Sequence, residues 1–369
     1  MKKILLLFLT LFVLLFPLKV NALDVNAKAY ILVNAETLGV IAGNNYNEKL
    51  PMASTTKIMT ALILAEHNTP QKTVKVTKEM IAVEGSSMGL LEGDTVSFND
   101  LLYGMLLASG NDAANVTAYV IGGSLEGFAK IMNKKAKEIG LKNTNFVTPS
   151  GLDNENHYST AYDLAVLTAY ALKNEAFKKA VSSYKATLFY GNPPYRRTLT
   201  NHNKLLVEFD DAIGVKTGFT KKAGRCLVSA AKRDGKRVIC VTWNDPQDWE
   251  DHTKLLNLGL NSVVNYTPKA QNQISVLSVI GGEKEAVNVN CNFGSVCLLE
   301  DEIKNLTYKI HYNKNIFAPI YKDQIVGYVT YHLNNKVIKS FNITAKETVK
   351  AVEISGFDKF LCCLKLLLN

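Results

Sequence analysis

The sequence predicts an α+β fold, an antiparallel sheet covered by helices on both faces, followed by a small all-β domain. Strand-like segments 28–34 and 38–43 lie near the start, and a hairpin of segments 225–231 and 237–243 lies much later. Helical segments lie between them, and strands at both ends with helices in the middle favour one sheet with helical layers. From about Tyr266 the pattern changes to short alternating segments between turn residues, which indicates a separate β domain.

The helices expected in the first part follow a period of about 3.6 residues. In chain order they cover residues 54–67, 99–108, a stretch that resumes after Asn111, 124–139, 160–173 and 251–260. After Tyr266 the chain has no long helical stretch. The strands expected there cover residues 274–279, 286–289, 306–310, 325–332 and 336–343.

The N-terminus has the pattern of a secretory signal peptide. Met1-Lys2-Lys3 is followed by an apolar run from Ile4 to Leu18 and by Val20-Asn21-Ala22. This is the order of charge, apolar segment and small-residue cleavage site. The alternative is a retained membrane helix, for which the run is short and Pro17 unfavourable. We therefore expect cleavage near Ala22 and an exported protein that works outside the cytoplasm.

The C-terminus has an amphipathic helical pattern. Charged residues lie on other faces than the apolar positions, which are Phe357, Phe360, Leu361, Leu364, Leu367 and Leu368. The segment is too short to span a bilayer. We expect it to lie on the outer face of the cytoplasmic membrane, the alternative being a helix docked on the protein's own surface. The expected division is a signal peptide at 1–22, an α+β domain at 23–265, an all-β domain at 266–350 and an amphipathic tail at 351–369.

The composition suits a globular protein outside the cytoplasm. The chain has 369 residues, of which 47% are hydrophobic and 20% charged, and its net charge is +9. Removal of the signal peptide, with its three lysines and no acidic residue, lowers the net charge to +6. This modest excess fits a polyanionic wall or an anionic membrane surface. No basic run or nucleic-acid-binding motif accompanies it, so no nucleic-acid partner is expected.

The cysteines and histidines do not predict a disulfide framework or a metal site. A turn at Asp234-Gly235 places Cys226 and Cys240 on opposite faces of the predicted hairpin, so these thiols should not pair. Cys291 and Cys297 either form a bridge or remain free. The six histidines are scattered without metal-ligand spacing, so no metal is expected.

The first candidate motif is Ser54-Thr55-Thr56-Lys57, an S-x-x-K sequence. Ser182 and Ser229 also precede a lysine by three residues, so the spacing alone is weak evidence. Ser229 lies in a predicted strand, where positions three apart face opposite sides, and no long apolar helix follows Ser182. Ser54 opens such a helix, where residues three apart share a face, so the lysine amine can reach the hydroxyl. The helix N-terminus also directs amides towards developing negative charge.

The second and third candidate motifs are Ser109-Gly110-Asn111 and Lys216-Thr217-Gly218. The second motif lies in a break between two helices, where Gly110 permits a tight turn, and its alternative interpretation is a helix cap. The third follows an apolar strand-like run, Ala212–Val215, and its alternative is an exposed edge strand. The order S-x-x-K, S-x-N, K-T-G in one exported chain points to a penicillin-recognising serine acyl-transfer enzyme.

With these motifs the chain resembles the low-molecular-mass penicillin-binding proteins that are D-alanyl-D-alanine carboxypeptidases, peptidase family S11. The resemblance runs from about Lys28 to the C-terminus and includes Gly85-Ser86-Ser87, Gly140–Thr144, Gly151-Leu152-Asp153, His157–Ala161 and Asp248–His252. It implies a serine β-lactamase-like catalytic domain and no cofactor. It also implies a substrate, the peptidoglycan pentapeptide ending in D-Ala-D-Ala, and acylation by β-lactam antibiotics.

Resemblance and local chemistry together assign the catalytic roles. Ser54 would attack the D-Ala-D-Ala carbonyl and form an acyl-enzyme. Lys57 would be the base, with a pKa lowered by burial and by Lys216. Ser109 would relay a proton towards the leaving amine, and Asn111 would orient Lys57 and the substrate amide.

The expected substrate-binding residues are Lys216, Thr217, Gly218 and Phe219. Thr217 would bind the terminal carboxylate, Lys216 would supply positive charge, and the oxyanion hole would use the backbone amides of Ser54 and Phe219. Some relatives place an arginine near the segment equivalent to Asp248–Asp251. This chain has none there, which leaves the carboxylate to Thr217 and Lys216.

Other functions share parts of this pattern. A class A β-lactamase would add a glutamate in an E-x-x-L-N sequence, which is absent between Asn111 and Lys216. A transpeptidase would use the same acyl-enzyme with an amine acceptor, and this alternative stays open. A non-catalytic wall-binding protein would be expected to lose Ser54, Lys57 or Lys216, and the scattered histidines disfavour a metallopeptidase.

Overall fold

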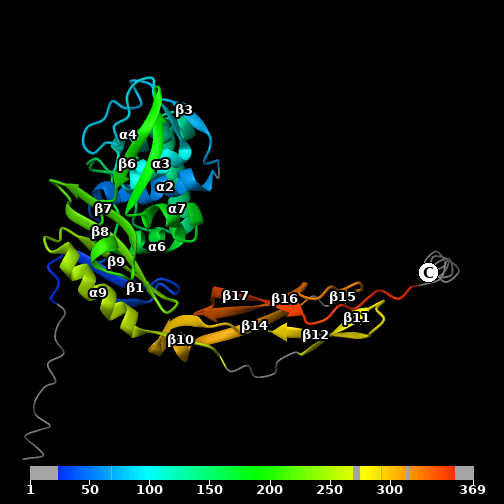
Figure 1. Ribbon diagram of the computed structural model, residues 1–369. Helices are drawn as coiled ribbons and strands as arrows, with labels where there is room; N and C mark the ends of the chain where they lie inside the picture. The colour runs from blue at the N-terminus through cyan, green and yellow to red at the C-terminus, as the bar shows by residue number, and fades with distance from the viewer. Residues whose placement is uncertain (1–23, 68, 269–274, 292, 313–315, 354–369) are drawn as a thin grey trace, which may run out of the picture.

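The computed structural model describes residues 24–67, 69–268, 275–291, 293–312 and 316–353. Figure 1 shows a part built of helices and a sheet, from which an elongated β-rich part extends towards the C-terminus. The predicted signal peptide and the predicted tail beyond residue 353 lie outside the described residues. Within the described ranges, no helix is both long enough and apolar enough to cross a bilayer.

The main sheet has five antiparallel strands in the order β2-β1-β9-β8-β7. They are β1 (Ala29–Asn34), β2 (Val40–Asn44), β7 (Ala212–Thr220), β8 (Gly224–Arg233) and β9 (Lys236–Trp243). The predicted β8–β9 hairpin is confirmed, with Cys226 opposite Trp243 and Ser229 opposite Cys240. Since β9 is central and both faces are covered, its β-branched run is buried on both sides.

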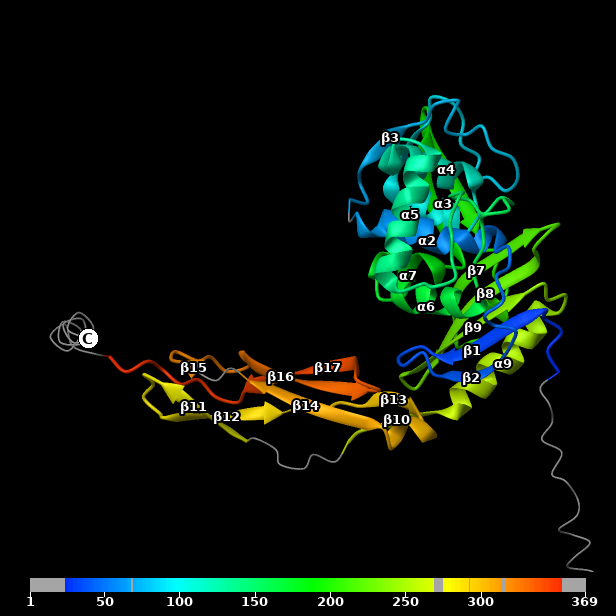
Figure 2. The same ribbon diagram turned by 180° about the vertical axis from the view of Figure 1, so that it is seen from behind.

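Helices cover both faces of this sheet, which confirms the predicted α+β architecture (Figure 2). On one face α9 (Asp248–Ser262) buries Leu255 and Leu256 in a cluster that contains Cys240. On the other face α2 (Lys57–Glu66) and α6 (Ala161–Ala171) pack in the larger core, which contains Cys226. The two thiols therefore lie on opposite sides of the sheet, and both are free, as predicted.

Most of the helical layer follows the predicted segments to within a few residues, but α7 and α8 were not predicted. It contains η1 (Ala53–Thr56, a 3₁₀ turn), α2 (Lys57–Glu66), α3 (Phe98–Leu106), α4 (Asn111–Gly122), α5 (Leu125–Ile139), α6 (Ala161–Ala171), α7 (Glu175–Val181) and α8 (Leu205–Glu208). Ser97 caps α3 in a box with Asp100, and Thr160 caps α6. One prediction needs correction, because Ser54 lies in the 3₁₀ turn and the α-helix begins only at Lys57.

A second, four-stranded sheet lies over the helical layer and was not predicted. Its order is β3-β4-β5-β6, from β3 (Thr73–Lys75), β4 (Thr95–Ser97), β5 (Lys185–Gly191) and β6 (Pro194–Thr200). β3 and β4 have only three residues each, and β6 is largely exposed, so neither length nor alternation identified these strands.

The C-terminal part contains a six-stranded sheet of order β14-β16-β17-β12-β11-β15 around its own apolar core. The strands are β11 (Val276–Ile280), β12 (Ala286–Cys291), β14 (Leu306–Tyr312), β15 (Ile316–Phe317), β16 (Ile325–Leu333) and β17 (Lys336–Ala345). Five of them match the predicted segments, and β15 was not predicted. Cys291 and Cys297 are both free, which decides between the two alternatives left by the sequence.

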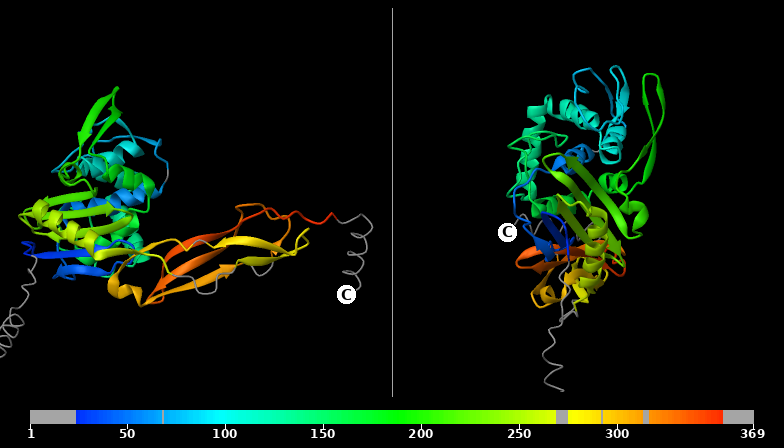
Figure 3. Two further views of the ribbon diagram at one scale, coloured as in Figure 1. Left: turned by 60° about the horizontal axis from the view of Figure 1, so that its bottom comes forward. Right: turned by 90° about the vertical axis from the view of Figure 1, so that its left-hand side faces the viewer.

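A short two-stranded ladder joins the two parts (Figure 3). It pairs β10 (Val263–Tyr266) with β13 (Val296–Leu299), which runs into α10 (Glu300–Ile303). The Asn34 side chain donates to the Cys297 carbonyl at 2.9 Å, and the Cys297 amide donates to Glu36 at 2.6 Å. Lys339 forms an ion pair with Glu36 at 2.8 Å. These polar contacts fix the β-rich part against the end of β1 and the turn that follows it.

Candidate active site

Ser54 lies in the 3₁₀ turn η1, where the backbone is strained and braced. Ala53 has φ +46°, a left-handed conformation that costs energy in a residue with a Cβ. The Ala53 carbonyl accepts a hydrogen bond from the Thr56 hydroxyl at 2.8 Å, and Thr56 Oγ1 lies 2.8 Å from His157 Nε2. A Cβ on Gly151 would lie 1.8 Å from the Ala53 carbonyl oxygen, so only glycine fits there. The nucleophile candidate is thus half-buried in a rigid turn whose other three residues are buried.

His157 is neutral and has a structural role, because it holds the Thr56 hydroxyl that bonds to the Ala53 carbonyl. Its Nδ1 accepts a hydrogen bond from the Val147 amide at 2.9 Å, so Nε2 carries the proton and donates to Thr56. Burial lowers the pKa of His157 to about 4. The His157–Ala161 segment therefore supports the Ser54 turn.

Lys57 contacts Ser54 in the way that the S-x-x-K spacing predicts. Its Nζ lies 2.9 Å from Ser54 Oγ, 2.7 Å from Asn111 Oδ1 and 2.7 Å from the Ser150 carbonyl oxygen. The Asn111 and Ser150 oxygens can only accept. A neutral amine has two N–H groups and one lone pair, so donation to these two oxygens leaves the lone pair facing the Ser54 hydroxyl.

Electrostatics favour the neutral amine. Burial, and next the neighbouring Lys216 ammonium, lower the pKa of Lys57 well below its usual range, while Asp112 acts in the opposite direction. Burial lowers the pKa of Lys216 to about 7. Two cations confined in one buried site disfavour each other, so the geometry and the charge balance both make Lys57 able to accept a proton.

The Ser109-Gly110-Asn111 motif approaches from the break between α3 and α4. Ser109 has φ +58°, a second strained residue beside the nucleophile. The capping alternative is not what is observed, because no side chain caps α4 and Asn111 instead contacts Lys57. Among the described residues the Ser109 hydroxyl has no hydrogen-bond partner, and it lines the same cavity as Ser54. Asn111 therefore contacts the Lys57 amine, and the Ser109 hydroxyl is free to contact a ligand in the cavity.

Strand β7 brings the third motif to Ser54. β7 is an edge strand of the main sheet, as the alternative interpretation of the third motif predicted. Lys216 is nevertheless only 1% exposed, because η1 packs on β7. Lys216 Nζ donates to the Thr217 carbonyl at 2.9 Å. A Cβ on Gly218 would lie 3.1 Å from the Ser54 backbone nitrogen, so glycine permits this close approach. Phe219 is 66% exposed at the mouth.

These elements enclose a cavity of about 310 Å³. It contains most of the predicted residues and several that were not predicted, and its lining is Ser54, Ser86, Ser109, His202, Thr217, Gly218, Phe219, Arg225, Cys226, Asp248 and Trp249. Of the predicted residues, Lys57, Asn111 and Lys216 lie behind this surface and reach it through Ser54 and Thr217. Asp248 is the single carboxylate of this lining, and it is already paired with an arginine.

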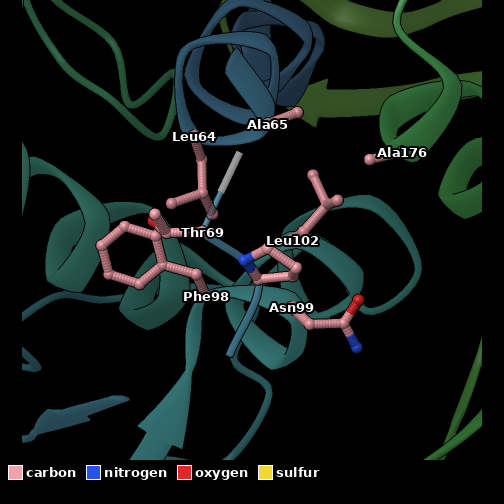
Figure 4. Close-up of a pocket in the computed structure, with 8 residues that line it drawn as sticks. Leu64, Ala65, Thr69, Phe98, Asn99, Leu102 and Ala176 are labelled. Carbon is pink, nitrogen blue, oxygen red and sulfur yellow. The ribbon is translucent and has the colours of Figure 1, made fainter. Parts of the chain in front are cut away.

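Figure 4 shows a different, apolar pocket of about 50 Å³ between α2, α3 and α7. Leu64 and Phe98 line it, and it contains no titratable side chain. Leu64 is ten residues beyond Ser54 along the chain, about 15 Å at the α-helical rise of 1.5 Å per residue. This pocket is therefore separate from the Ser54 cavity.

Arg225 is an arginine that contacts the Asp248–Asp251 segment, for which the sequence predicted none. The Asp248–Asp251 segment indeed has none, but Arg225 reaches it from the neighbouring strand β8. Its guanidinium donates to both carboxylate oxygens of Asp248, at 2.7 and 3.2 Å, and lies 5.8 Å from the Trp249 ring centroid. The predicted β8–β9 hairpin placed Arg225 at its open end, but the contact with Asp248 depends on how α9 packs beside β8.

The described residues include no group of three or more His, Cys, Asp or Glu side chains arranged to hold a metal ion. The buried His252, for example, contacts Ser229 Oγ and Thr242 Oγ1. This cluster explains the rival Ser229 motif as part of the core.

The sequence is similar to known proteins over most of its length. A sequence model described as D-alanyl-D-alanine carboxypeptidase, peptidase S11, matches residues 17–247, and one for the C-terminal domain of penicillin-binding protein 5 matches residues 266–351. The D-alanyl-D-alanine carboxypeptidase DacF of Bacillus subtilis is 33% identical over 91% of this chain and 88% of its own length. DacC of Escherichia coli is 33% identical over 90% and 86%.

Two solved structures are similar as well. Penicillin-binding protein 5 of Haemophilus influenzae has a TM-score of 0.63 and 28% identity, covering 89% of this chain and 98% of its own. The DD-transpeptidase of Streptomyces K15 has a TM-score of 0.62 and 33% identity, covering 64% of this chain and 98% of its own.

Proposed function

Since the chain belongs to the D-alanyl-D-alanine carboxypeptidase family, peptidase S11, we propose that the Ser54 cavity is its active site. The chain is a serine-type D-Ala-D-Ala carboxypeptidase, a hydrolase that removes the terminal D-alanine from peptidoglycan stem peptides, and a penicillin-binding protein. The catalytic residues proposed are Ser54, Lys57, Ser109 and Asn111. The substrate-binding residues proposed are Lys216, Thr217, Gly218 and Phe219, to which we add Arg225.

Acylation begins with proton transfer from Ser54 to Lys57. The Lys57 lone pair accepts the hydroxyl proton while Asn111 and Ser150 hold the amine, and Ser54 Oγ forms a bond to the penultimate D-alanine carbonyl. The backbone amides of Ser54 and Phe219 stabilise the oxyanion. Ser109 relays the proton that Lys57 has taken up to the leaving D-alanine nitrogen as the peptide bond breaks. Water then attacks the acyl-enzyme and releases the shortened peptide.

The terminal carboxylate of the substrate binds between Thr217 and Arg225. Thr217 offers its hydroxyl from β7, and Arg225 is the cation that lines the cavity surface. Asp248 holds two guanidinium N–H groups and leaves others free to face the ligand. A free D-alanine carboxylate is the feature that distinguishes this substrate from an internal peptide bond, so this pair favours a carboxypeptidase over an endopeptidase.

The observation that carries the proposal is the Lys57 amine, buried and within hydrogen-bond distance of Ser54, Asn111 and Ser150. The test is release of D-alanine from a pentapeptide ending in D-Ala-D-Ala, with the L-Ala-L-Ala peptide as control. Wild type should release the terminal alanine only from the D-Ala-D-Ala peptide, and Ser54→Ala should release it from neither peptide. Equal cleavage of both peptides, or activity in Ser54→Ala, would refute the assignment.

We also propose that the chain is exported and attached peripherally to the outer face of the cytoplasmic membrane. The support is the signal-like order of residues 1–22 and the apolar helical spacing after Ser355. The elongated β-rich part would then hold the Ser54 cavity away from the membrane (Figure 1). N-terminal sequencing of the mature protein should begin near Leu23. Deletion of residues after Ser355 should release the protein from membranes, and unchanged membrane binding would contradict the anchor.

A further inference from the structure

Asp112, which follows the S-x-N motif, has a role that the catalytic scheme does not include. It is 2% exposed, and its carboxylate faces the irregular segment 84–90. It accepts hydrogen bonds from the Ser87 hydroxyl at 2.5 Å and from the amides of Met88, Gly89 and Leu90 at 3.0, 3.1 and 3.0 Å. One buried carboxylate therefore collects four donors from a segment with no regular structure of its own.

The same segment contacts the catalytic Asn111. The side-chain Nδ2 of Asn111 donates to the Glu84 carbonyl at 2.6 Å, and the backbone N–H of Asn111 donates to the Ser86 carbonyl at 2.7 Å. Ser86 lines the Ser54 cavity. Since Nδ2 is engaged by Glu84, Oδ1 is the atom that must face Lys57. The position of the segment thus decides which end of the Asn111 amide meets the lysine.

The outer side of the segment is hydrogen-bonded to the four-stranded sheet. The Tyr190 hydroxyl donates to the Met88 carbonyl at 2.7 Å, and Arg197 donates to the Gly89 carbonyl at 2.7 Å. These two contacts hold the segment from the surface, while Asp112 holds it from the interior. The part of the cavity wall that Ser86 forms therefore belongs to a segment held between α4 and the β5–β6 hairpin.

We propose that Asp112 is a positioning residue, which clamps segment 84–90 against Asn111 and thereby keeps Asn111 Oδ1 on Lys57. The inference rests on the proposed catalytic roles of Lys57 and Asn111. The Asp112 charge also acts on Lys57, where it partly offsets the lowering of the pKa by burial and by Lys216. The other titratable group near Asp112 that we consider is Tyr190, whose pKa is raised to about 12, chiefly by burial. Tyr190 therefore does not titrate in the range where acylation is measured, and Lys57 reports on Asp112.

The test measures the second-order rate constant of acylation by a labelled penicillin as a function of pH. In Asp112→Asn the amide nitrogen cannot accept from the segment, so the clamp opens. We expect the rate constant to fall by about tenfold or more, as for small displacements of catalytic groups. Loss of the negative charge also lowers the pKa of Lys57 further, so the acidic limb of the profile should move to lower pH.

A merely structural role would give the opposite pH shift. If Asp112 only held the fold together, its loss would admit water to Lys57, relieve the desolvation and move the acidic limb to higher pH. Asp112→Glu keeps the charge but not the geometry, so it should lower the rate without moving the limb. Asp100→Asn, which removes a buried capping carboxylate at the start of α3, is the matched control and should change Tm alone.

Ser87→Ala keeps the test decisive if Asp112→Asn does not fold. It removes one hydrogen bond to Asp112 without changing α4, and it should lower the acylation rate by a smaller factor with the limb unmoved. A wild-type rate in both Ser87→Ala and Asp112→Glu, or a limb that moves to higher pH in Asp112→Asn, would overturn the inference. Absence of any penicillin adduct on wild type would instead refute the proposed function itself.

Discussion

Replacing Arg225 with glutamine probes the carboxylate site that the structure adds to the motifs. The Arg225 side chain is 44% exposed, lines the Ser54 cavity and is fixed by two hydrogen bonds to Asp248. Glutamine keeps the polar stem but removes the charge and the fork of N–H groups. The change should therefore weaken the hold on the D-alanine carboxylate and leave Ser54 and Lys57 in place.

The magnitude follows from the exposure of the guanidinium. A hydrogen bond to a charged group contributes about 1.5–3 kcal/mol, and partial exposure to solvent favours the lower end of that range. Because about 1.4 kcal/mol corresponds to a factor of ten, we expect kcat/KM for D-alanine release to fall by about tenfold. The loss should be mainly in kcat/KM for substrates with a free terminal carboxylate.

The chain offers a matched control on the same strand. Arg233 also lies on β8, is 37% exposed and donates two hydrogen bonds to a carboxylate, that of Asp211, at 3.0 and 2.6 Å. It does not line the Ser54 cavity. Arg233→Gln should therefore reproduce any general effect of losing an arginine–aspartate pair without changing D-alanine release.

The assay compares a pentapeptide that has a free D-alanine carboxylate with the same peptide as its C-terminal amide. Wild type should prefer the free acid, and Arg225→Gln should reduce that preference by lowering only the activity on the acid. An equal loss on both peptides would mean that Arg225 acts through the fold. An unchanged kcat/KM on the acid would refute the carboxylate site.

Three further predictions concern the nucleophile and its supports. Lys57→Arg should abolish penicillin acylation, because arginine stays protonated; in wild type the acylation rate should fall as pH is lowered through the depressed pKa of Lys57. Gly218→Ala should slow acylation with little change in Tm, since its Cβ would lie 3.1 Å from the Ser54 nitrogen, whereas Gly123→Ala, with no atom within 4 Å, should leave acylation unchanged. His157 has a pKa of about 4 in the folded protein, below its ordinary value of 6.5. Between these two pH values the unfolded chain binds more protons than the folded protein, so the free energy of unfolding falls as pH is lowered through that window. His157→Gln should therefore lose less Tm than wild type between about pH 7 and about pH 5.

The catalytic motifs were predictable because their geometry is local. The pairing of Ser54 with Lys57 follows from one helical turn, and the break at Ser109 follows from Gly110 between two apolar helices. The β8–β9 register was also predictable, since Asp234-Gly235 fixes a two-residue turn. Each of these features depends on residues close together in sequence.

What the sequence did not reveal depends on distant segments. The exposed-edge alternative for Lys216 was excluded only by its burial against η1, more than 150 residues earlier in the chain. Arg225 became a site candidate only when β8 and the start of α9 were seen to pack together. The contacts of Asp112 with Ser87 to Leu90 link α4 to an irregular segment that has no periodicity to recognise.

The most direct test of the account is the site of covalent labelling by a penicillin. Intact-mass and peptide-mapping measurements on the protein should show one adduct, on the peptide that contains Ser54, at a pH where Lys57 is neutral. Ser54→Ala should show none, while Ser182→Ala, which alters the rival S-x-x-K serine, should be labelled like wild type. An adduct that persists in Ser54→Ala, or that maps to Ser109 or Ser182, would contradict the central claim that Lys57 activates Ser54 as the nucleophile.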